Sequence, residues 1–152
     1  MRVLLQRVKK ASVAINDHEI RTIATGLVAF LGVREGDDEA AARYLADRVV
    51  HLRLFEDTEG KTNLSLLEVQ GSVLAVSQFT LYADCTRGRR PGFTNAARPD
   101  LALPLYQRFV HFLKEHQITV AEGEFGAHRL VEIHNDGPFT IWLDSDDKRG
   151  EG

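Results

Sequence analysis

The sequence predicts a single α+β domain, on three observations. The chain has 152 residues, of which 43% are hydrophobic and 27% charged, and these values are ordinary for one compact soluble domain. Its first third consists of short apolar segments with polar residues between them, which is typical of strands. Two later segments, beginning near residues 37 and 99, repeat apolar residues at three- and four-residue steps, which is typical of amphipathic helices. We therefore treat residues 1–152 as one domain.

The first third of the chain predicts an antiparallel meander. Four apolar segments follow one another, and residues 16–18, between the second and the third, have the composition of a tight turn. The segments are Val3–Val8, Ala11–Ile15, Ile20–Ile23 and Gly26–Val33. Since a membrane span needs about 20 apolar residues, the last and longest segment is a buried strand candidate and not a span.

Two amphipathic helices follow. Asp37 or Asp38 can cap the first helix. Pro99 suits the first turn of the second helix, while Pro104, about one turn further on, predicts a later start or a small kink. The apolar faces contain Ala41, Tyr44, Leu45, Val49 and Leu52 in the first helix, and Leu101, Leu105, Tyr106, Phe109, Phe112 and Leu113 in the second.

The remaining segments predict further strands and one long loop. The segment from Tyr82 to Thr94 has too much glycine and proline for a regular element, and loops on rigid frames often hold function. Strands are expected at Arg53–Phe55, Ser72–Phe79, Ile118–Ala121, Leu130–Ile133 and Phe139–Leu143.

The charge of the chain argues against a protein that coats DNA. Its 19 Lys and Arg and 22 Asp and Glu give a formal net charge of −3, so DNA is not expected as a partner. Two stretches are nevertheless locally basic. Their basic residues are Arg2, Arg7, Lys9 and Lys10 in the first, and Arg87, Arg89, Arg90 and Arg98 in the second. These charges either face water or contact phosphate groups.

The sequence also argues against several classes of site. Cys85 is the one cysteine, so it cannot form an internal disulfide, and we expect it to be an incidental thiol. His111 and His116 are five residues apart and lie on different faces of a helix, so we expect no metal site and no cofactor. The glycine-rich nucleotide loops and the Gly-x-Ser-x-Gly elbow are absent. Without a signal peptide or a membrane span, we expect the protein in the cytoplasm.

Two polar clusters interrupt apolar strands and are the candidate sites. Ser77, Gln78 and Thr80 lie at the end of a predicted strand, where burial is costly for polar groups without partners. Asn135–Pro138 predicts a tight turn between two strands. From the residues alone, the rim of a strand and an ordinary hairpin turn are the simpler interpretations.

Both clusters resemble the D-aminoacyl-tRNA deacylase family. The motifs that carry the resemblance are Ser77–Asp84, Gly88–Pro91, Phe125–Ala127 and Asn135–Thr140, and similarity extends over essentially the whole chain. One short match would be weak, but several in the same order and spacing are highly specific. The resemblance implies an α+β fold with an antiparallel, barrel-like sheet and flanking helices, and it implies a homodimer.

The resemblance implies hydrolysis of the ester that joins a D-amino acid to the 3′ end of tRNA. Ser77–Leu81 would form the floor of the site for the aminoacyl group and the terminal adenosine, which places Ser77 and Gln78 there. Backbone N–H groups near Phe79 and Thr80 are candidate donors to the developing oxyanion. Thr80 either positions a water molecule or acts as the nucleophile, and we favour the first because no histidine or carboxylate lies beside it. In this family the 2′-hydroxyl of the tRNA assists the reaction.

The same resemblance assigns chiral selection to Gly137 and Pro138. In the family this peptide bond is cis, and the segment of one subunit enters the site of the other. Rejecting an L-amino acid by about 10⁴ requires about 5.5 kcal/mol, which a rigid backbone can supply by a clash. Many D-amino acids, and glycine, which lacks a Cβ, would then be accepted. Arg87, Arg89, Arg90 and Arg7 would hold phosphates of the tRNA acceptor stem.

Departures from the family pattern are few. Gly92, Arg98 and Glu124 differ from the residues we expect there, and none lies in the two central motifs. A sister family of deacylases has Pro-Gln-Ala-Thr in place of Ser77–Thr80, and this difference argues against membership of the sister family. The remaining alternative is a tRNA-binding or replication-associated structural protein that keeps the fold without activity.

Overall fold

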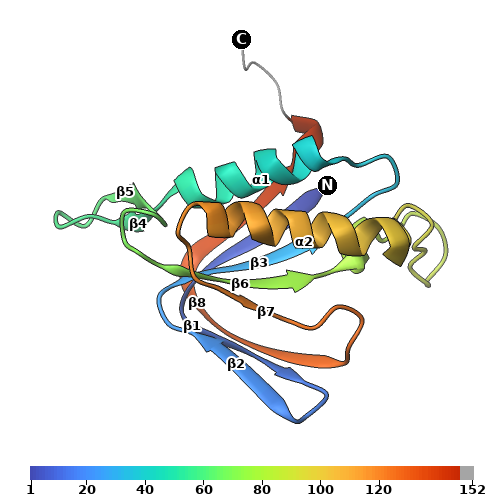
Figure 1. The fold of residues 1–152 in the computed structure, drawn as a ribbon, viewed down its shortest axis with the longest axis horizontal. Coiled ribbons are helices and arrows are strands. Elements are labelled where there is room, and N and C mark those ends of the chain that lie inside the picture. The colour runs from blue at the N-terminus through green and yellow to red at the C-terminus, as the bar shows by residue number, and fades with distance from the viewer. Residues whose placement is uncertain (148–152) are drawn as a thin grey trace.

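Two α-helices lie side by side across one face of a curved sheet in the computed structural model, which describes residues 1–147 (Figure 1). The helices are α1 (Glu39–His51) and α2 (Pro99–Glu115), and two short 3₁₀ turns are η1 (Phe79–Tyr82) and η2 (Ser145–Asp147). The strands are β1 (Arg2–Ile15), β2 (Glu19–Ile23), β3 (Gly26–Gly32), β4 (Arg53–Glu56), β5 (Thr62–Ser65), β6 (Ser72–Ser77), β7 (Val120–Glu122) and β8 (Arg129–Asp144).

The main sheet is mixed, so the expectation of an antiparallel sheet is wrong for two of its pairs. Its strand order is β2-β1-β3-β6-β7, with β8 paired to β1, while β4 and β5 form a separate hairpin. The pairs β3–β6 and β6–β7 are parallel. A long connection containing α1 or α2 lies between the paired strands in each case, and parallel neighbours require such a crossover.

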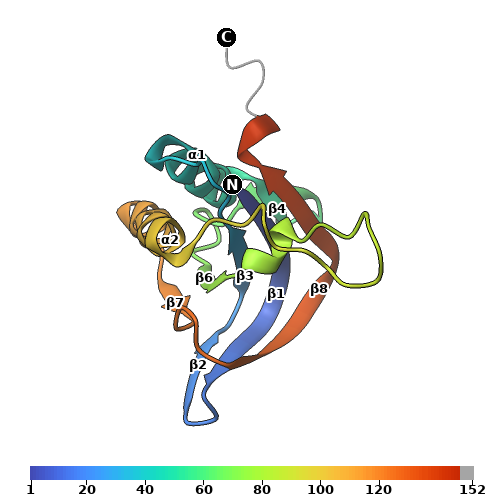
Figure 2. The same cartoon turned by 90° about the vertical axis from the view of Figure 1, so that its right-hand side faces the viewer.

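The long strands β1 and β8 curl the sheet into a nearly closed, barrel-like form (Figure 2). The first half of β1 pairs with β3, its second half pairs with β2, and β8 follows it along both halves. The two segments predicted as Val3–Val8 and Ala11–Ile15 are therefore one continuous strand. This curvature encloses part of the sheet face that the helices leave uncovered.

β8 runs without a break through Asn135–Pro138, so the prediction of a hairpin turn between two strands is wrong. Both halves of β8 pair with β1. Residues 6–8 of β1 face residues 135–140 of β8, and the excess residues on β8 form an irregular bulge. Proline has no N–H for the ladder, which explains why the pairing fails at this point.

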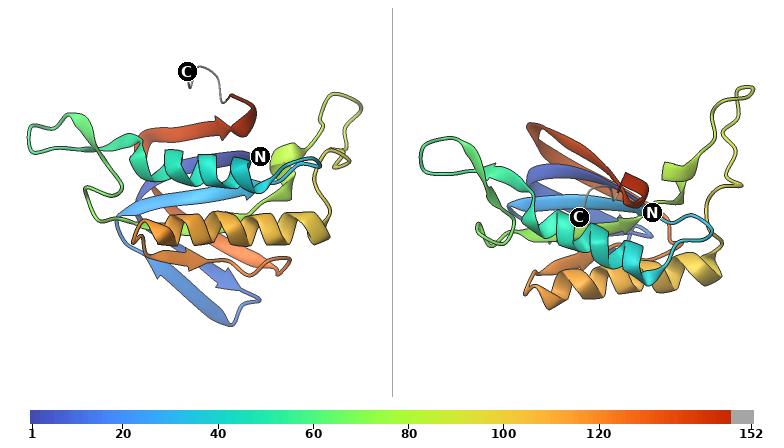
Figure 3. Two further views of the ribbon diagram at one scale, coloured as in Figure 1. Left: turned by 45° about the horizontal axis from the view of Figure 1, so that its top comes forward. Right: turned by 90° about the horizontal axis from the view of Figure 1, so that it is seen from above.

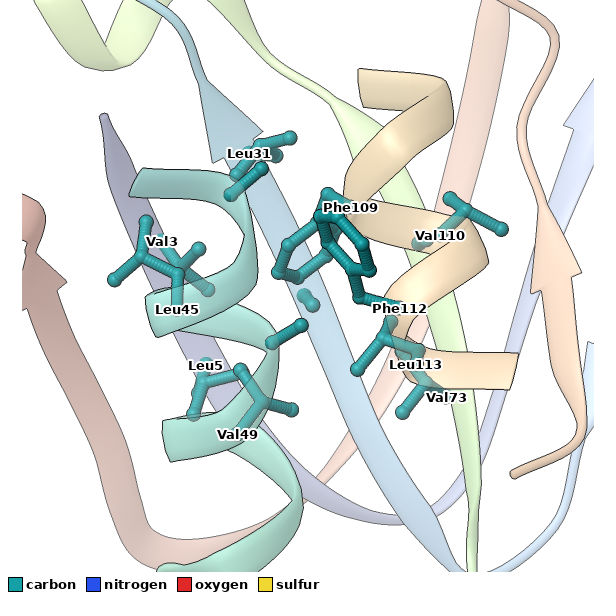
Figure 4. Packing of buried hydrophobic residues seen from close by; sticks show 14 of the residues in the cluster. Val3, Leu5, Leu31, Leu45, Val49, Val73, Phe109, Val110, Phe112 and Leu113 are labelled. Carbon is teal, nitrogen blue, oxygen red and sulfur yellow. The ribbon is translucent and has the colours of Figure 1, made fainter. Parts of the chain in front are cut away.

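Two apolar clusters fill the fold. The larger lies between the sheet and the helices, where Phe109, Phe112 and Leu45 pack on Leu5 and Leu31 (Figure 4). The smaller lies inside the curl of the sheet and consists of Val8, Ala11, Val13, Ile15, Ile23, Val28, Leu74 and Val76. The sheet is thus apolar on both faces along β3 and β6, as is typical of parallel strands.

The helix ends follow the predicted signals. Asp38 caps α1, and its carboxylate accepts a hydrogen bond from the Ala41 N–H at 2.9 Å. Pro99 begins α2, and Pro104 lies within that helix, so the helix does not start later. No helix within residues 1–147 is long and apolar enough to cross a membrane.

Candidate active site

A cavity of about 550 Å³ opens where β6 ends, and we call it the strand-end cavity. Ser77 and Phe79 contribute to its lining from the end of β6 and from η1. Residues 93–102 before and within α2, and residues 125–129 before and at the start of β8, supply most of the rest. The lining is mainly apolar with a few polar groups, which is typical of ligand sites, and carboxyl ends of parallel strands often bind ligands.

The chain leaves β6 through η1, so the predicted strand Ser72–Phe79 ends two residues early, at Ser77. The Gln78 N–H donates to the Leu31 carbonyl at 2.7 Å. Within η1, the Leu81 N–H donates to the Gln78 carbonyl at 3.2 Å. The N–H groups of Phe79 and Thr80 precede this donor and have no acceptor within the turn. Neither N–H has an acceptor among the described residues, and Phe79 is the one of the two residues that lines the strand-end cavity.

The four side chains predicted at the catalytic centre fall into two pairs. Ser77 and Phe79 line the strand-end cavity, and the Phe79 ring meets the Phe93 ring edge-on with 5.1 Å between centroids. Gln78 and Thr80 do not line it, and the Gln78 side-chain amide donates to the Thr80 hydroxyl. Among the described residues, this amide is the one hydrogen-bond partner of the Thr80 side chain, so no general base contacts Thr80.

Residues Gly137 and Pro138 lie exposed on the bulge of β8, and they do not line the strand-end cavity of their own chain. The peptide bond between them is cis, in agreement with the expectation. Arg7 connects this bulge to β4 through the Leu54 carbonyl. β4 and the carboxyl end of β6 lie at opposite ends of the ribbon (Figure 1), so one chain does not bring the two polar clusters together.

Arg7 is held inside the fold, where it supports the bulge. Its side chain is 5% exposed, and Nη1 donates to the Leu54 carbonyl at 2.7 Å. Nε lies 3.2 Å from both the Asp136 carboxylate and the Asp136 carbonyl, and the guanidinium covers the Phe139 ring. The Asn135 amide donates to the Arg7 carbonyl at 2.9 Å. The guanidinium is therefore turned inward in this chain, and the contact of Arg7 with tRNA stays a prediction.

The other arginines predicted to contact phosphate lie on a hairpin-like loop, residues 84–92, which we call the arginine hairpin. Two hydrogen bonds between the backbones of Asp84 and Gly92, of 2.7 and 2.8 Å, close its base. Hydrogen bonds from the Thr86 side chain and backbone lower the pKa of Asp84. Arg87, Arg89 and Arg90 are exposed, with no ion pair to a described residue. Figure 3 shows this segment extending away from the helices and the sheet.

Arg129 is a residue of the cavity that the sequence analysis missed. Its guanidinium donates to the Ser77 carbonyl and, at 3.4 Å, to the Gln78 side-chain oxygen. Burial lowers the pKa of Arg129 from its ordinary value. The residue directly precedes the apolar strand segment predicted at Leu130–Ile133, and only its nearness to the Phe125–Ala127 motif could have indicated it.

Arg2, near the start of β1, contacts the last residues of η1 and fixes this turn to the sheet. Its guanidinium donates to the Leu81 carbonyl at 2.9 Å, pairs with Asp144 at 3.2 Å and lies 4.3 Å from the Tyr82 ring centroid. The Tyr82 hydroxyl is buried without a hydrogen-bond partner among the described residues, and burial raises its pKa. The turn that presents the two free amides is thus fixed to β1 and to the end of β8.

Comparison with known proteins decides the family. A family model described as D-Tyr-tRNA(Tyr) deacylase matches residues 4–144. The chain belongs to this family. Proteins named D-aminoacyl-tRNA deacylase from Thermomicrobium roseum and Thermus aquaticus are 54% and 50% identical to this deacylase over 150 residues. Both matches cover 99% of the chain, and they cover 97% and 99% of the relatives.

Solved structures agree with the fold of this deacylase. One described as c-Myc DNA Unwinding Element Binding Protein is 34% identical, with a TM-score of 0.88 over 95% of this chain and 98% of that one. Another, described as a probable eukaryotic D-amino acid tRNA deacylase, is 21% identical with a TM-score of 0.79 over 93% and 97% of the two chains, and it shows the shared fold. The family resemblance found in the sequence is confirmed, and the deacylase is a hydrolase.

Proposed function

We propose that the protein hydrolyses the ester bond of D-aminoacyl-tRNA and releases the D-amino acid and free tRNA. The observation that carries this proposal is the strand-end cavity, because its mainly apolar lining includes Phe79, whose N–H at the start of η1 has no acceptor among the described residues. Family membership supports the substrate class. Such a proofreading enzyme acts where aminoacyl-tRNA is found, so we expect it in the cytoplasm.

The chemistry we propose needs few protein groups. An aminoacyl ester is already reactive, so a well-placed water and donors to the oxyanion are sufficient. The Phe79 and Thr80 N–H groups are the proposed donors. Thr80 acts as an orienting group, because its hydroxyl contacts the Gln78 amide and no base. The 2′-hydroxyl of the terminal adenosine then assists proton transfer, since no histidine or carboxylate among the described residues contacts the Thr80 hydroxyl.

The terminal adenosine is proposed to occupy the apolar part of the strand-end cavity. Phe79, Phe93 and Phe125 line it, and aromatic rings of this kind stack on a nucleobase in a sequence-tolerant way. Arg87, Arg89 and Arg90 on the arginine hairpin would then contact acceptor-stem phosphates, because they are exposed and carry no acidic partner within the described residues.

A homodimer is proposed to complete the site. On the sheet face away from the helices, Leu4 is paired in register with Phe30 on one side and with Trp142 on the other. The chain covers this apolar row only in part, and Trp142 is 48% exposed. A second copy placed over this face would bury the row and would bring its own Gly137–Pro138 segment to the cavity.

Chiral selection is proposed to come from that segment. D and L substrates carry the same groups and differ in the direction of Cβ, so affinity for the side chain cannot separate them. The hydrogen bonds of Arg7 and Asn135 hold the segment firmly, and a firmly held backbone can exclude an L side chain. Glycine has no Cβ, and we expect glycyl-tRNA to be hydrolysed as well.

A single-turnover assay with D-tyrosyl-tRNA and L-tyrosyl-tRNA tests the proposal. We expect rapid hydrolysis of the D substrate and hydrolysis of the L substrate slower by about 10⁴. Equal rates would refute chiral selection. Hydrolysis of neither substrate above the uncatalysed rate would refute the enzyme and favour a structural nucleic-acid-binding protein with this fold.

A further inference from the structure

Arg129 places a positive charge in the wall of the strand-end cavity without an acidic partner. Its hydrogen bonds within residues 1–147 go to neutral acceptors, namely the carbonyls of Ser77 and Ala127 and the side-chain oxygen of Gln78. The side chain is half-buried, and this burial lowers its pKa. A charge removed from water is stabilised poorly unless an opposite charge accompanies it.

The rest of the cavity does not neutralise this guanidinium. Among the described residues that line the cavity, the other charged one is Arg98, which is also basic, and none is acidic. The chain as a whole carries a formal net charge of −3. The cavity is therefore positive within an acidic protein, which favours a ligand with a negative group at this position.

We propose that Arg129 forms an anion subsite of the cavity, which receives a carboxylate or phosphate oxygen of the bound aminoacyl-tRNA. This inference rests on the proposed function. The oxygen has two sources in the substrate, the side-chain carboxylate of an acidic D-amino acid and the phosphodiester that precedes the terminal adenosine. Arg129 contacts Ser77 and Gln78 directly before η1, where the ester is proposed to lie, so the carboxylate is the nearer source.

The subsite makes Arg129 a residue that determines specificity. A guanidinium pairs with a carboxylate through directed hydrogen bonds, whereas it repels the α-ammonium group that all aminoacyl substrates carry. The ammonium group must then lie away from Arg129. An acidic D-amino acid would gain an interaction that its neutral isostere lacks.

The experiment compares D-aspartyl and D-asparaginyl groups on one tRNA, since these side chains have nearly the same shape and differ in charge. The variants are Arg129→Met, which keeps the length of the side chain, and Arg129→Lys, which keeps the charge. Arg43→Met is the matched control, because Arg43 is exposed on α1 and contacts the Phe112 ring and Glu115, outside the lining of the cavity. Steady-state kcat and KM and the melting temperature are measured for each.

We expect Arg129→Met to lower kcat/KM about tenfold more for D-aspartyl-tRNA than for D-asparaginyl-tRNA, because only the first substrate loses a charge-assisted hydrogen bond. A loss of equal size on both substrates, confined to KM, identifies the phosphodiester as the anion. Arg129→Lys should lose less kcat/KM than Arg129→Met in either case, because it keeps the positive charge. Unchanged or higher activity on both substrates overturns the anion subsite. Wild-type protein that hydrolyses neither substrate refutes the proposed function instead, so the two failures are distinct.

Discussion

The strand-end cavity and the Gly137–Pro138 segment differ in what one chain provides. One chain lines the cavity by itself, because β6, η1, α2 and the start of β8 all contribute to its walls. The Gly137–Pro138 segment is equally well supported, through Arg7 and Asn135, yet it is exposed and borders no part of that cavity. This combination of firm support and exposure is what the proposed contact with a second copy requires.

The arginines of the two regions show the same contrast. Arg7 has a carboxylate partner and donates to backbone carbonyls, so its charge is neutralised within the fold. Within residues 1–147, the hydrogen bonds of Arg129 go to neutral oxygens, and no carboxylate pairs with its guanidinium. A paired buried arginine fixes structure, whereas an unpaired one facing a cavity is placed to bind a ligand.

Removing the support of the segment should have the largest effect. Arg7→Met leaves the Leu54 carbonyl and Asp136 without their donor, which should lower the free energy of unfolding by about 2–3 kcal/mol. The loosened segment should lower hydrolysis of D-tyrosyl-tRNA by about 100-fold and reduce the D-to-L rate ratio. Denaturant unfolding and single-turnover rates measure both quantities, with Arg7→Lys as the charge-conserving control. A folded Arg7→Met protein with an unchanged ratio would show that this segment does not select the enantiomer.

A smaller change at the tip of the segment separates its stability from its function. In Gly137→Ala the new Cβ would meet the Asn135 side-chain oxygen at 3.7 Å, an ordinary contact, and φ of Gly137 is outside the left-handed region. The melting temperature should therefore stay the same. If the segment enters the cavity of a second copy, the added methyl group should slow hydrolysis by about tenfold. Wild-type rates in this variant would contradict such an insertion.

The smallest effect is expected from the arginine hairpin. Replacing Arg89 and Arg90 with alanine should weaken binding to all tRNAs and reduce the slope of log affinity against log salt by about 1.5 to 2. The D-to-L ratio should not change, because neither residue lines the cavity. Filter binding at several salt concentrations gives the slope. A shifted ratio would instead place these arginines at the reacting group.

The sequence predicted the elements better than their pairing. Both helices were found because their caps and apolar repeats are local signals, as at Asp38 and Pro99. The continuous apolar runs of β3 and β6 indicate burial on both faces, but they do not tell which strands pair, because the parallel pairing depends on a crossover through α1. The continuity of β8 was missed because proline and glycine at 137–138 are the residues of a turn, whereas here they form a bulge on a strand that keeps one partner.

The candidate site was also predicted only where its residues are close in sequence. The motifs pointed to Ser77 and Phe79, which are close in sequence and both line the strand-end cavity, and their catalytic role stays a prediction. The burial of Arg7 and the position of Arg129 in the cavity wall were not predicted, because the surroundings of a charged side chain depend on its neighbours in space. Arg7 meets Leu54 and Asp136 from distant strands, and Arg129 meets the end of β6, and neither contact has a sequence signature.

One strand links all of these features. β8 begins at Arg129, continues through the Gly137–Pro138 bulge and ends at Asp144, the partner of the arginine that holds η1. The register of β8 against β1 therefore sets the distances between Arg129, the Gly137–Pro138 bulge and Asp144. Adding or deleting one residue within β8 would turn its alternating side chains to the opposite faces and displace all three at once. The exposed turn between β4 and β5 can accept an inserted or deleted residue. The 16 residues of β8 cannot, because each insertion or deletion changes the register of the whole strand.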